Sequence, residues 1–323
     1  MSMAKEHFVV IGARGFIGSW ICRLLIEEGV KVTATDTNPD PRSMSSVLDP
    51  GHLSKMTYLV SDARNPEAVS ALIGEDVTHV IYLAGLLRPA SENNPLLSSQ
   101  VSIGGLINVL DVSVRRSGKL GIAYSSTAAV YGPASDYPNG QIDDKSLPAP
   151  RDHYGVHRYT MEMTANAYFN EHGVTSMGLR PWVVYGAGRF NGLSAQPSLA
   201  MLAAAAGTPF HMQFGGRNVV QHVRDVALAF IRSARAKLDG AKQANIPGES
   251  IEMTDLIAVI EKSAPKARGM ITCEMKDLGA PSRLADPRLE QLIGPLPSPT
   301  AERVEETIAD YRKLLADGRI SFP

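Results

Sequence analysis

Residues 7–18 read His7-Phe8-Val9-Val10-Ile11-Gly12-Ala13-Arg14-Gly15-Phe16-Ile17-Gly18. The first five residues form an apolar run that predicts a buried strand, and glycines then recur at every third position. Glycine permits a tight turn and close backbone approach, and a helix starting there offers free N–H groups and its positive dipole end to an anion. The segment predicts a strand, turn and helix that bind the pyrophosphate of a dinucleotide. A purely structural glycine turn is the alternative.

Outward from this segment, short β-type runs alternate with stretches of helical periodicity. The predicted strands are 7–11, 30–35, 57–60, 79–83, 120–125 and 176–179. The predicted helices between them are 16–28, 66–73, 95–117 and 155–171. Such alternation is typical of βαβ units around a parallel sheet. We therefore predict the α/β class, with a Rossmann-type doubly wound parallel sheet.

Residue 180 marks a change in pattern, because glycine and proline punctuate the chain beyond it. The later predicted helices are 199–206, 226–238, 255–263 and 301–315, and the proline-rich stretch 281–299 is interpreted as a surface connection. We expect residues 1–180 to form the dinucleotide-binding domain, joined by 222–240. Residues 181–323 are expected to form mainly a smaller substrate-binding lobe.

Composition excludes several classes of partner. The formal net charge is −1 and the basic residues are dispersed, so neither nucleic acid nor an anionic membrane is an expected partner. We find no apolar stretch that approaches the ~20 residues of a membrane span. The two cysteines, Cys22 and Cys273, indicate neither a disulfide framework nor a metal site, and we expect a cytoplasmic protein without a metal.

Two carboxylates follow predicted strands at positions suited to a dinucleotide. Asp36 ends the second strand, where a carboxylate accepts hydrogen bonds from ribose hydroxyls and repels a 2′-phosphate, which favours NAD over NADP. Arg14 argues in the opposite direction, because a guanidinium there can pair with a 2′-phosphate. Asp62 follows the third strand and can bond the adenine amino group, or else cap a helix or turn.

Hydroxyl-bearing residues follow the fifth predicted strand, and a tyrosine opens a helix about thirty residues later. The two segments are Ala123-Tyr124-Ser125-Ser126-Thr127-Ala128-Ala129-Val130-Tyr131-Gly132 and Tyr154-Gly155-Val156-His157-Arg158. Here the chain resembles the extended short-chain dehydrogenases of the NAD-dependent epimerase/dehydratase type. Further matches in the family's order are Gly12 to Gly18, Leu83-Ala84-Gly85, Leu179-Arg180-Pro181, Val184-Tyr185-Gly186 and His222-Val223-Arg224-Asp225-Val226-Ala227.

The resemblance implies a role for each matching residue. Tyr154 is the general acid/base, Thr127 or alternatively Ser126 bonds the same substrate oxygen, and Arg158 stands where the family has a lysine that holds the nicotinamide ribose and favours the phenolate. The implied NAD-binding residues are Gly12, Arg14, Gly15, Phe16, Ile17, Gly18, Asp36, Asp62, Ala63, Leu83, Ala84, Gly85, Tyr154, Arg158 and Pro181. The family also implies a homodimer built from helices 95–117 and 155–171. Val101, Leu106, Val109 and Met161 support it, because they exceed what a single buried face needs.

Three positions depart from the family pattern. Arg158 replaces the lysine, Ser102 replaces a structural asparagine, and Asn218 stands where nucleotide-sugar enzymes commonly place an arginine for the substrate pyrophosphate. Ala128 and Ala129 stand where dehydratases tend to carry an acidic pair. We therefore expect an NAD-dependent oxidoreductase or epimerase that acts on a hydroxyl or keto carbon of a sugar, sugar acid or similar polar hydroxy compound. The alternative is an NAD-binding regulatory or sensor protein with little turnover.

Overall fold

The computed structural model describes residues 6–296 and 299–322, and only the backbone at residues 41–43. Its main sheet has seven strands in the order β11-β7-β5-β4-β1-β2-β3, and every neighbouring pair is parallel. The strands are β1 His7–Ile11, β2 Lys31–Asp36, β3 Thr57–Val60, β4 His79–Tyr82, β5 Gly121–Ser125, β7 Ser176–Arg180 and β11 Ala241–Asn245. The predicted Rossmann-type sheet is confirmed.

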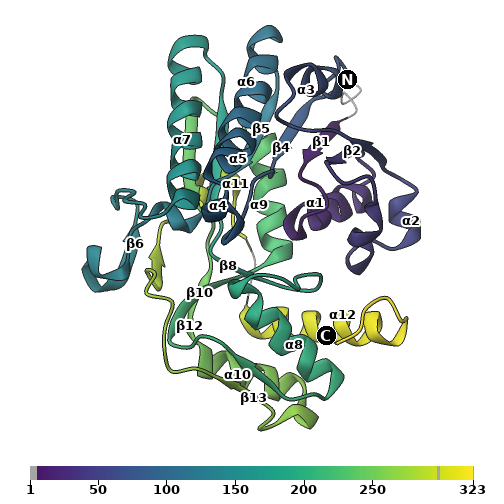
Figure 1. The fold of residues 1–323 in the computed structure, drawn as a ribbon, viewed down its shortest axis with the longest axis vertical. Helices are drawn as coiled ribbons and strands as arrows, with labels where there is room; N and C mark the ends of the chain where they lie inside the picture. Colours follow the sequence, from purple (N-terminus) through teal and green to yellow (C-terminus); the bar gives the residue numbers. More distant parts are fainter. Residues whose placement is uncertain (1–5, 297–298, 323) are drawn as a thin grey trace.

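β1 is an interior strand between β4 and β2, and all five of its side chains are buried, on two opposite faces. Phe8 and Val10 pack with α1 (Phe16–Glu27) and α9 (Val223–Arg235), whereas Val9 and Ile11 pack with α3 (Pro66–Leu72) and the long helices beyond it. This division follows from the two-residue period of a strand. Figure 1 shows these helices covering the sheet.

Strand order reverses between β1 and β4, and ligands of open α/β sheets bind at such a switch point. Ile11 is in register with Thr35 of β2 and Tyr82 of β4, so these strands end at one edge. The glycine turn, Asp36 and Leu83-Ala84-Gly85 all follow there. The fold therefore brings the predicted cofactor residues of three separate segments to one crevice.

The predicted helix 95–117 is interrupted. It consists of α5 (Pro95–Ser99), a π-helical segment (Gln100–Gly104) and α6 (Gly105–Arg115). Tyr82 of β4 donates its hydroxyl to the carbonyl of Val101 within the π segment. A Cβ at Gly105 would lie 2.0 Å from that hydroxyl oxygen, so the helix can pass the tyrosine only at a glycine.

Residues 95–115 are long and apolar enough to cross a membrane by length and composition alone, with a mean hydropathy of 1.3 over their window. The expectation that no stretch approaches this length was therefore wrong. However, 44% of the window is buried inside the protein, and α6 packs against α3 and α7 (His153–His172). The apolar character is explained by this packing, as for a core helix.

The same packing accounts for three of the four residues behind the homodimer argument, whereas Val101 is half-buried. Leu106, Val109 and Met161 are all fully buried within the chain's own core, between α6, α7 and the sheet. Their apolar character is therefore explained without a second subunit. The homodimer itself stays a prediction.

The smaller lobe lies beyond the carboxyl edge of the main sheet (Figure 1). Its strands form three small sheets, β12-β10-β8, β13-β9 and β14-β6. The strands are β6 Gln141–Asp143, β8 Val183–Tyr185, β9 Phe210–Met212, β10 Arg217–His222, β12 Glu249–Glu252, β13 Ile271–Cys273 and β14 Arg283–Ala285. The helices are α8 Gln196–Ala206, α10 Met253–Ser263, α11 Arg288–Ile293 and α12 Thr300–Ala316.

The segment after β10 packs against the main sheet through α9, which contacts β4, β5 and α1, and β11 then pairs with β7. One expectation for this half is corrected. The stretch 281–299 is more than a surface connection. It contains β14, which pairs with β6, and α11, whose Leu289 is fully buried; residues 297–298 lie outside the described chain.

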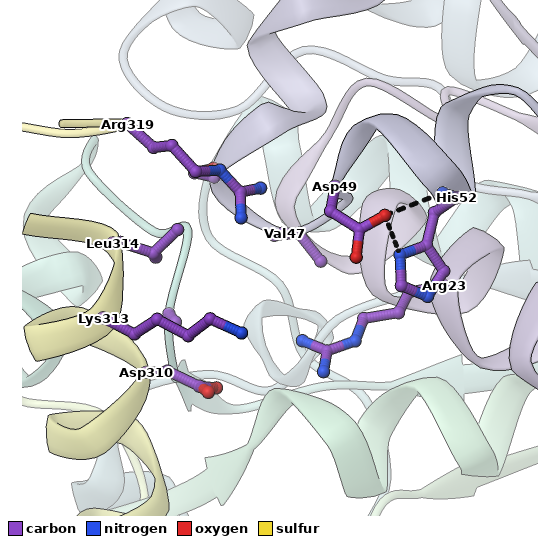
Figure 2. Close-up of a pocket in the computed structure, with 10 residues that line it drawn as sticks. Arg23, Val47, Asp49, His52, Asp310, Lys313, Leu314 and Arg319 are labelled. Atoms are coloured by element: carbon purple, nitrogen blue, oxygen red, sulfur yellow. Dashed lines mark hydrogen bonds and ion pairs between the residues drawn. The ribbon is translucent and has the colours of Figure 1, made fainter. Parts of the chain in front are cut away.

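A pocket lies between α1, the segment 46–52 and α12, and none of the predicted site residues lines it (Figure 2). Asp49 accepts the backbone N–H of His52 (2.8 Å) and pairs with its ring Nδ1 (2.9 Å). Arg23 donates to Glu27 (2.8 Å), and Arg319 donates to the carbonyl oxygen of Leu48 (2.8 Å). The bond from Arg319 fastens the C-terminal segment to the segment 46–52.

Candidate active site

The glycine turn after β1, residues 12–18, exposes its backbone without side chains at Gly12, Gly15 and Gly18, and is called the cofactor cradle below. Gly12 has φ +84°, and a Cβ there would lie 2.9 Å from the backbone nitrogen of Ala84. A Cβ at Gly18 would lie 2.6 Å from the carbonyl oxygen of Gly12. The N-cap of α1 is Gly15, and no side chain caps the helix. The close approach of the β1 and β4 turns and the open helix N-terminus fit a dinucleotide pyrophosphate.

Asp36 is held at the carboxyl end of β2. Its carboxylate accepts backbone N–H groups from Thr37 (2.9 Å) and Arg14 (3.3 Å), which fixes the side chain beside the glycine turn. The Gly12 and Ala13 N–H groups also bond the carbonyl oxygen of Thr35, so turn and strand end form one unit. A carboxylate in this place is suited to bind ribose hydroxyls and to repel a 2′-phosphate.

Asp62 bonds its own turn. Arg64 donates to it from Nε (3.0 Å) and Nη2 (2.6 Å) and from its backbone N–H (2.9 Å), and the Arg64 side-chain bonds lower the pKa of the Asp62 carboxyl. This geometry matches the turn-capping alternative. Ala63 is buried, and its carbonyl oxygen accepts a hydrogen bond from Asn108 of α6 (2.8 Å).

Tyr154 lies in the first turn of α7 between two guanidinium groups. The guanidinium carbon of Arg158 lies 5.5 Å from the centre of the phenol ring, and that of Arg88 lies 5.6 Å from it. Arg88 is held by Asp152, the N-cap residue of α7, at 3.2 Å. Both guanidinium groups are therefore at cation–π distance from the tyrosine ring.

The first turn of α7 is fixed by two carboxylates. Asp152 accepts the N–H of Gly155 (2.8 Å), and Glu92 of α4 (Ala90–Asn93) accepts those of Tyr154 (3.0 Å) and His153 (3.2 Å). Although desolvation opposes the shift, these backbone bonds lower the pKa of the Glu92 carboxyl. The sequence indicated no role for Glu92, because no local spacing relates it to α7.

Arg158 is 2% exposed and fills the space below the tyrosine. Its Nη1 donates to the carbonyl oxygen of Ser125 at the end of β5 (2.8 Å). A Cβ at Gly85 would lie 2.2 Å from Nη2 of Arg158 and 3.1 Å from the hydroxyl of Ser102. Glycine at position 85 therefore makes room for the guanidinium. Arg158 and Ser102, two of the residues that depart from the family pattern, both lie beside this glycine.

The two candidate hydroxyls have different surroundings. Ser126 is 1% exposed and donates to the buried Glu162 of α7 (2.6 Å), so its hydroxyl is already engaged inside the fold. Thr127 accepts the N–H of Ala129 (3.2 Å). Pro181 is buried, and its carbonyl oxygen accepts the N–H of Ala128 (2.9 Å), which ties together the turns after β5 and β7.

Behind these turns lies a buried ion pair. Arg180 at the end of β7 donates to Glu162 from Nε (2.8 Å) and Nη2 (2.6 Å), and the two side chains are 7% and 0% exposed. Arg180 also donates to the hydroxyl of Tyr131 (2.7 Å). The sequence carried one signal for this pair, because Glu162 lies one helical turn after Arg158 and so shares its inward face.

Arg189 of the smaller lobe was not singled out by the sequence. Its guanidinium carbon lies 5.6 Å from the ring centre of Phe16, the first residue of α1, and its Nη2 donates to Ser194 (2.6 Å). Burial lowers the pKa of Arg189 to about 10, although Tyr154 is close enough for its charge to oppose the shift. Arg189 therefore lies beside the cofactor cradle, at the start of α1.

Two of the histidines are neighbours on α7, where the ring centres of His153 and His157 lie 5.8 Å apart. His222 is buried and bonds the hydroxyl of Thr307 (3.2 Å), and desolvation lowers its pKa to about 3, so it is neutral at physiological pH. His157 bonds Ser98 (3.0 Å). Within residues 6–296 and 299–322, no three His, Cys, Asp or Glu side chains are grouped as metal ligands.

A family model for the NAD-dependent epimerase/dehydratase family matches residues 8–246, which are most of the chain. The chain belongs to this family. The family is NAD-dependent, which fits the glycine turn and Asp36. Membership confirms the resemblance found from the glycine turn, the hydroxyl segment and the tyrosine helix.

Relatives within the epimerase/dehydratase family are distant. An uncharacterized epimerase/dehydratase of Staphylococcus haemolyticus is 28% identical over 179 residues, which are 54% of this chain and 52% of that protein. The chain spans about half the length of this and other curated relatives. A CDP-paratose 2-epimerase of Salmonella typhi is 22% identical over 282 residues, which are 78% of this chain and 83% of that protein.

Solved structures share the fold of this family member over its whole length. An L-threonine dehydrogenase of Clostridium difficile superposes with a TM-score of 0.82 at 18% identity, covering 99% of this chain and 100% of that one. At such low identity the likeness establishes the fold alone.

The position of Asp36 predicts how the chain discriminates between cofactors. The unchanged protein should bind NAD at least about tenfold more tightly than NADP, and Asp36→Ser should remove most of this preference because the charge that repels a 2′-phosphate is lost. Calorimetric titration with both cofactors measures the ratio. Asp239→Ser removes an equal charge from an exposed pair with Lys242 and should leave the ratio unchanged. A wild-type preference for NADP would show that Arg14 dominates instead.

Proposed function

We propose that this enzyme is an NAD-dependent dehydrogenase or epimerase that acts on a hydroxyl or keto carbon of a sugar, sugar acid or similar polar hydroxy compound. Tyr154 is its general acid/base. The observation that carries the proposal is the position of Tyr154, which lies beside the crevice of the switch point with guanidinium groups 5.5 Å and 5.6 Å from its ring centre.

NAD, when bound, supplies hydride chemistry at the substrate carbon. The glycine turn and Asp36 hold and orient the cofactor. Tyr154 takes the proton of a substrate hydroxyl, or returns it to a carbonyl oxygen. A phenol with an ordinary pKa of ~10 is a poor base at neutral pH, and a fixed cation nearby favours the phenolate. Arg158 supplies that charge from inside the protein, where water screens it weakly.

Thr127 is the better of the two candidate hydroxyls for the substrate oxygen. Ser126 donates its proton to Glu162, so using it on a substrate would leave a buried carboxylate without one of its partners. Thr127 accepts only a backbone N–H, and its own hydroxyl proton has no acceptor among the described residues. We therefore assign to Thr127 the hydrogen bond that orients the substrate oxygen.

A substrate without a nucleotide is supported by the residues that replace the expected pyrophosphate anchor. Asn218 is buried and donates to the carbonyl oxygen of Gly215 (3.1 Å) within its own turn. Its neighbour Arg217 pairs with Glu252 (3.1 Å) and donates to the carbonyl oxygen of Ser250 (2.9 Å). The side chains of Asn218 and Arg217 therefore already have hydrogen-bond or ion-pair partners within the protein.

The test incubates the purified protein and NAD with a panel of sugars, aldonates, uronates and short hydroxy acids at neutral pH. Absorbance follows NADH, which a dehydrogenase releases, and NMR follows inversion of the substrate carbon, because an epimerase returns the hydride and forms no net NADH. We expect NADH formation or epimerisation with at least one hydroxylated compound. NAD binding without turnover across the panel would instead support the regulatory alternative, for which the replacements at Arg158 and Ser102 are the motivation. A cytoplasmic location and the homodimer remain predictions.

The charge of Arg158 should govern the pH dependence of this reaction. Arg158→Lys should keep activity, because it retains the cation. Arg158→Met should move the activity profile to higher pH, since the phenolate loses a stabilising charge, and a shift of one unit corresponds to about 1.4 kcal/mol. The measurement is turnover from pH 6 to 10 for the three proteins. A profile for Arg158→Met that matches wild type at every pH would refute the role.

A further inference from the structure

Arg189 is a half-buried cation whose charge no carboxylate among the described residues balances. Within residues 6–296 and 299–322, no carboxylate lies at ion-pairing distance from its guanidinium, and its Nε is buried with no hydrogen-bond partner. The ion-paired arginines Arg180 and Arg303, by contrast, hold Glu162 and Asp225. Burying an unpaired charge is unfavourable, so such a group is retained where a ligand completes it.

The local backbone places this side chain against the start of α1. Gly188 has φ +98°, and a Cβ there would lie 2.6 Å from Val47 and 3.7 Å from the ring of Phe16, so only glycine fits. The turn presses the segment after β8 against the start of α1, and the guanidinium of the next residue lies on the Phe16 ring. Nη2 of Arg189 donates to the hydroxyl of Ser194 (2.6 Å). The other N–H groups of the guanidinium are left to donate to a ligand.

We propose that Arg189 binds an anionic group, carboxylate or phosphate, carried by the substrate. The inference rests on the proposed function and narrows its substrate class to acids. The glycine turn already offers its backbone to the cofactor pyrophosphate, whereas Arg189 comes from the smaller lobe and lies within electrostatic range of Tyr154. The planar guanidinium suits a carboxylate or a phosphate, and it replaces the nucleotide anchor that Asn218 and Arg217 do not provide.

The test compares anions with neutral partners of the same shape. With the protein saturated with NAD, calorimetry gives the Kd of D-gluconate against D-glucitol, of D-glycerate against glycerol, and of glycerol 3-phosphate against glycerol. At least one anion should bind wild type about tenfold or more tightly than its partner, as expected for charge-assisted hydrogen bonds. Arg189→Met should abolish the preference, and Arg189→Lys should keep part of it. Arg268→Met, an exposed site in the smaller lobe, should behave as wild type.

Each outcome decides the matter. The proposal is overturned if no anion is preferred by wild type, or if Arg189→Met keeps the preference. It is also overturned if Arg189→Met weakens NAD binding tenfold while the anion preference persists, because Arg189 then serves the cofactor pyrophosphate. A preference for glycerol 3-phosphate alone identifies the group as phosphate, and a preference for the aldonates identifies a carboxylate. Binding needs no turnover, so Tyr154→Phe should retain the preference even if the proposed reaction fails.

Discussion

Replacement of Tyr154 by phenylalanine should lower turnover at least about 10² to 10⁴-fold, the range that a positioned general acid/base contributes. The change removes one oxygen atom. The ring should stay between Arg88 and Arg158, because both cations contact its face and the first turn of α7 is held by Glu92 and Asp152. The NAD Kd should therefore stay within about twofold of wild type, since the phenol contributes mainly to the chemical step.

Turnover of NAD with the substrate found by the panel measures the first effect, and calorimetry measures the second. The matched control is Tyr168→Phe, which removes the same atom from the same helix about four turns away, where the hydroxyl donates to Asp111 (2.6 Å). That variant should keep full activity. Wild-type turnover in Tyr154→Phe would mean that another group moves the proton and that the assigned mechanism does not operate.

Glu162→Ala should destabilise the protein by about 3 to 5 kcal/mol, the cost of leaving a buried charge without its partner. Arg180 would lose two hydrogen bonds and its counter-charge while keeping only Tyr131, and Ser126 would lose its acceptor. Urea unfolding followed by circular dichroism measures the change. The exposed pair of Asp136 and Arg151 provides the contrast, because Asp136→Ala should cost no more than about 1 kcal/mol.

A second variant separates loss of the ion pair from loss of packing. The double replacement Glu162→Met and Arg180→Met removes both charges and fills the space with apolar atoms, so it should be more stable than Glu162→Ala. If the single and double variants unfold at the same urea concentration, the cost comes from the space vacated and the unpaired charge contributes little.

The sequence predicted most of the main sheet because its strands and turns are encoded locally. Residues 7–18 contain the buried strand, the turn and the open helix end within twelve positions, and Asn-Pro pairs mark the starts of α3 and α5, where Asn65 and Asn94 cap (2.9 and 3.0 Å). The π segment was missed because its cause is distant in sequence: the Tyr82 hydroxyl bonds the Val101 carbonyl across the gap between β4 and the helix.

The candidate site divides in the same way. Tyr154 and Arg158 lie one helical turn apart, so their spacing places them on one face of a helix. Glu92 and Arg189 had no such signal, because each reaches the tyrosine from another part of the chain. The homodimer argument failed for a related reason. The sequence shows that Leu106 and Val109 are apolar, but only the fold shows that α3, α7 and the sheet already cover them.

The bonds from Glu92 to the start of α7 couple the position of α4 to that of the tyrosine helix. Moving α4 outward would break two backbone hydrogen bonds at once and leave the N–H groups of His153 and Tyr154 without their acceptor. Access to the tyrosine therefore cannot come from swinging this segment as an independent flap. The turn carrying Gly188 and Arg189 is tied to a different element, the start of α1, by packing and ring contacts. The two arginines near the tyrosine and the cofactor turn, Arg88 and Arg189, thus belong to separately anchored segments.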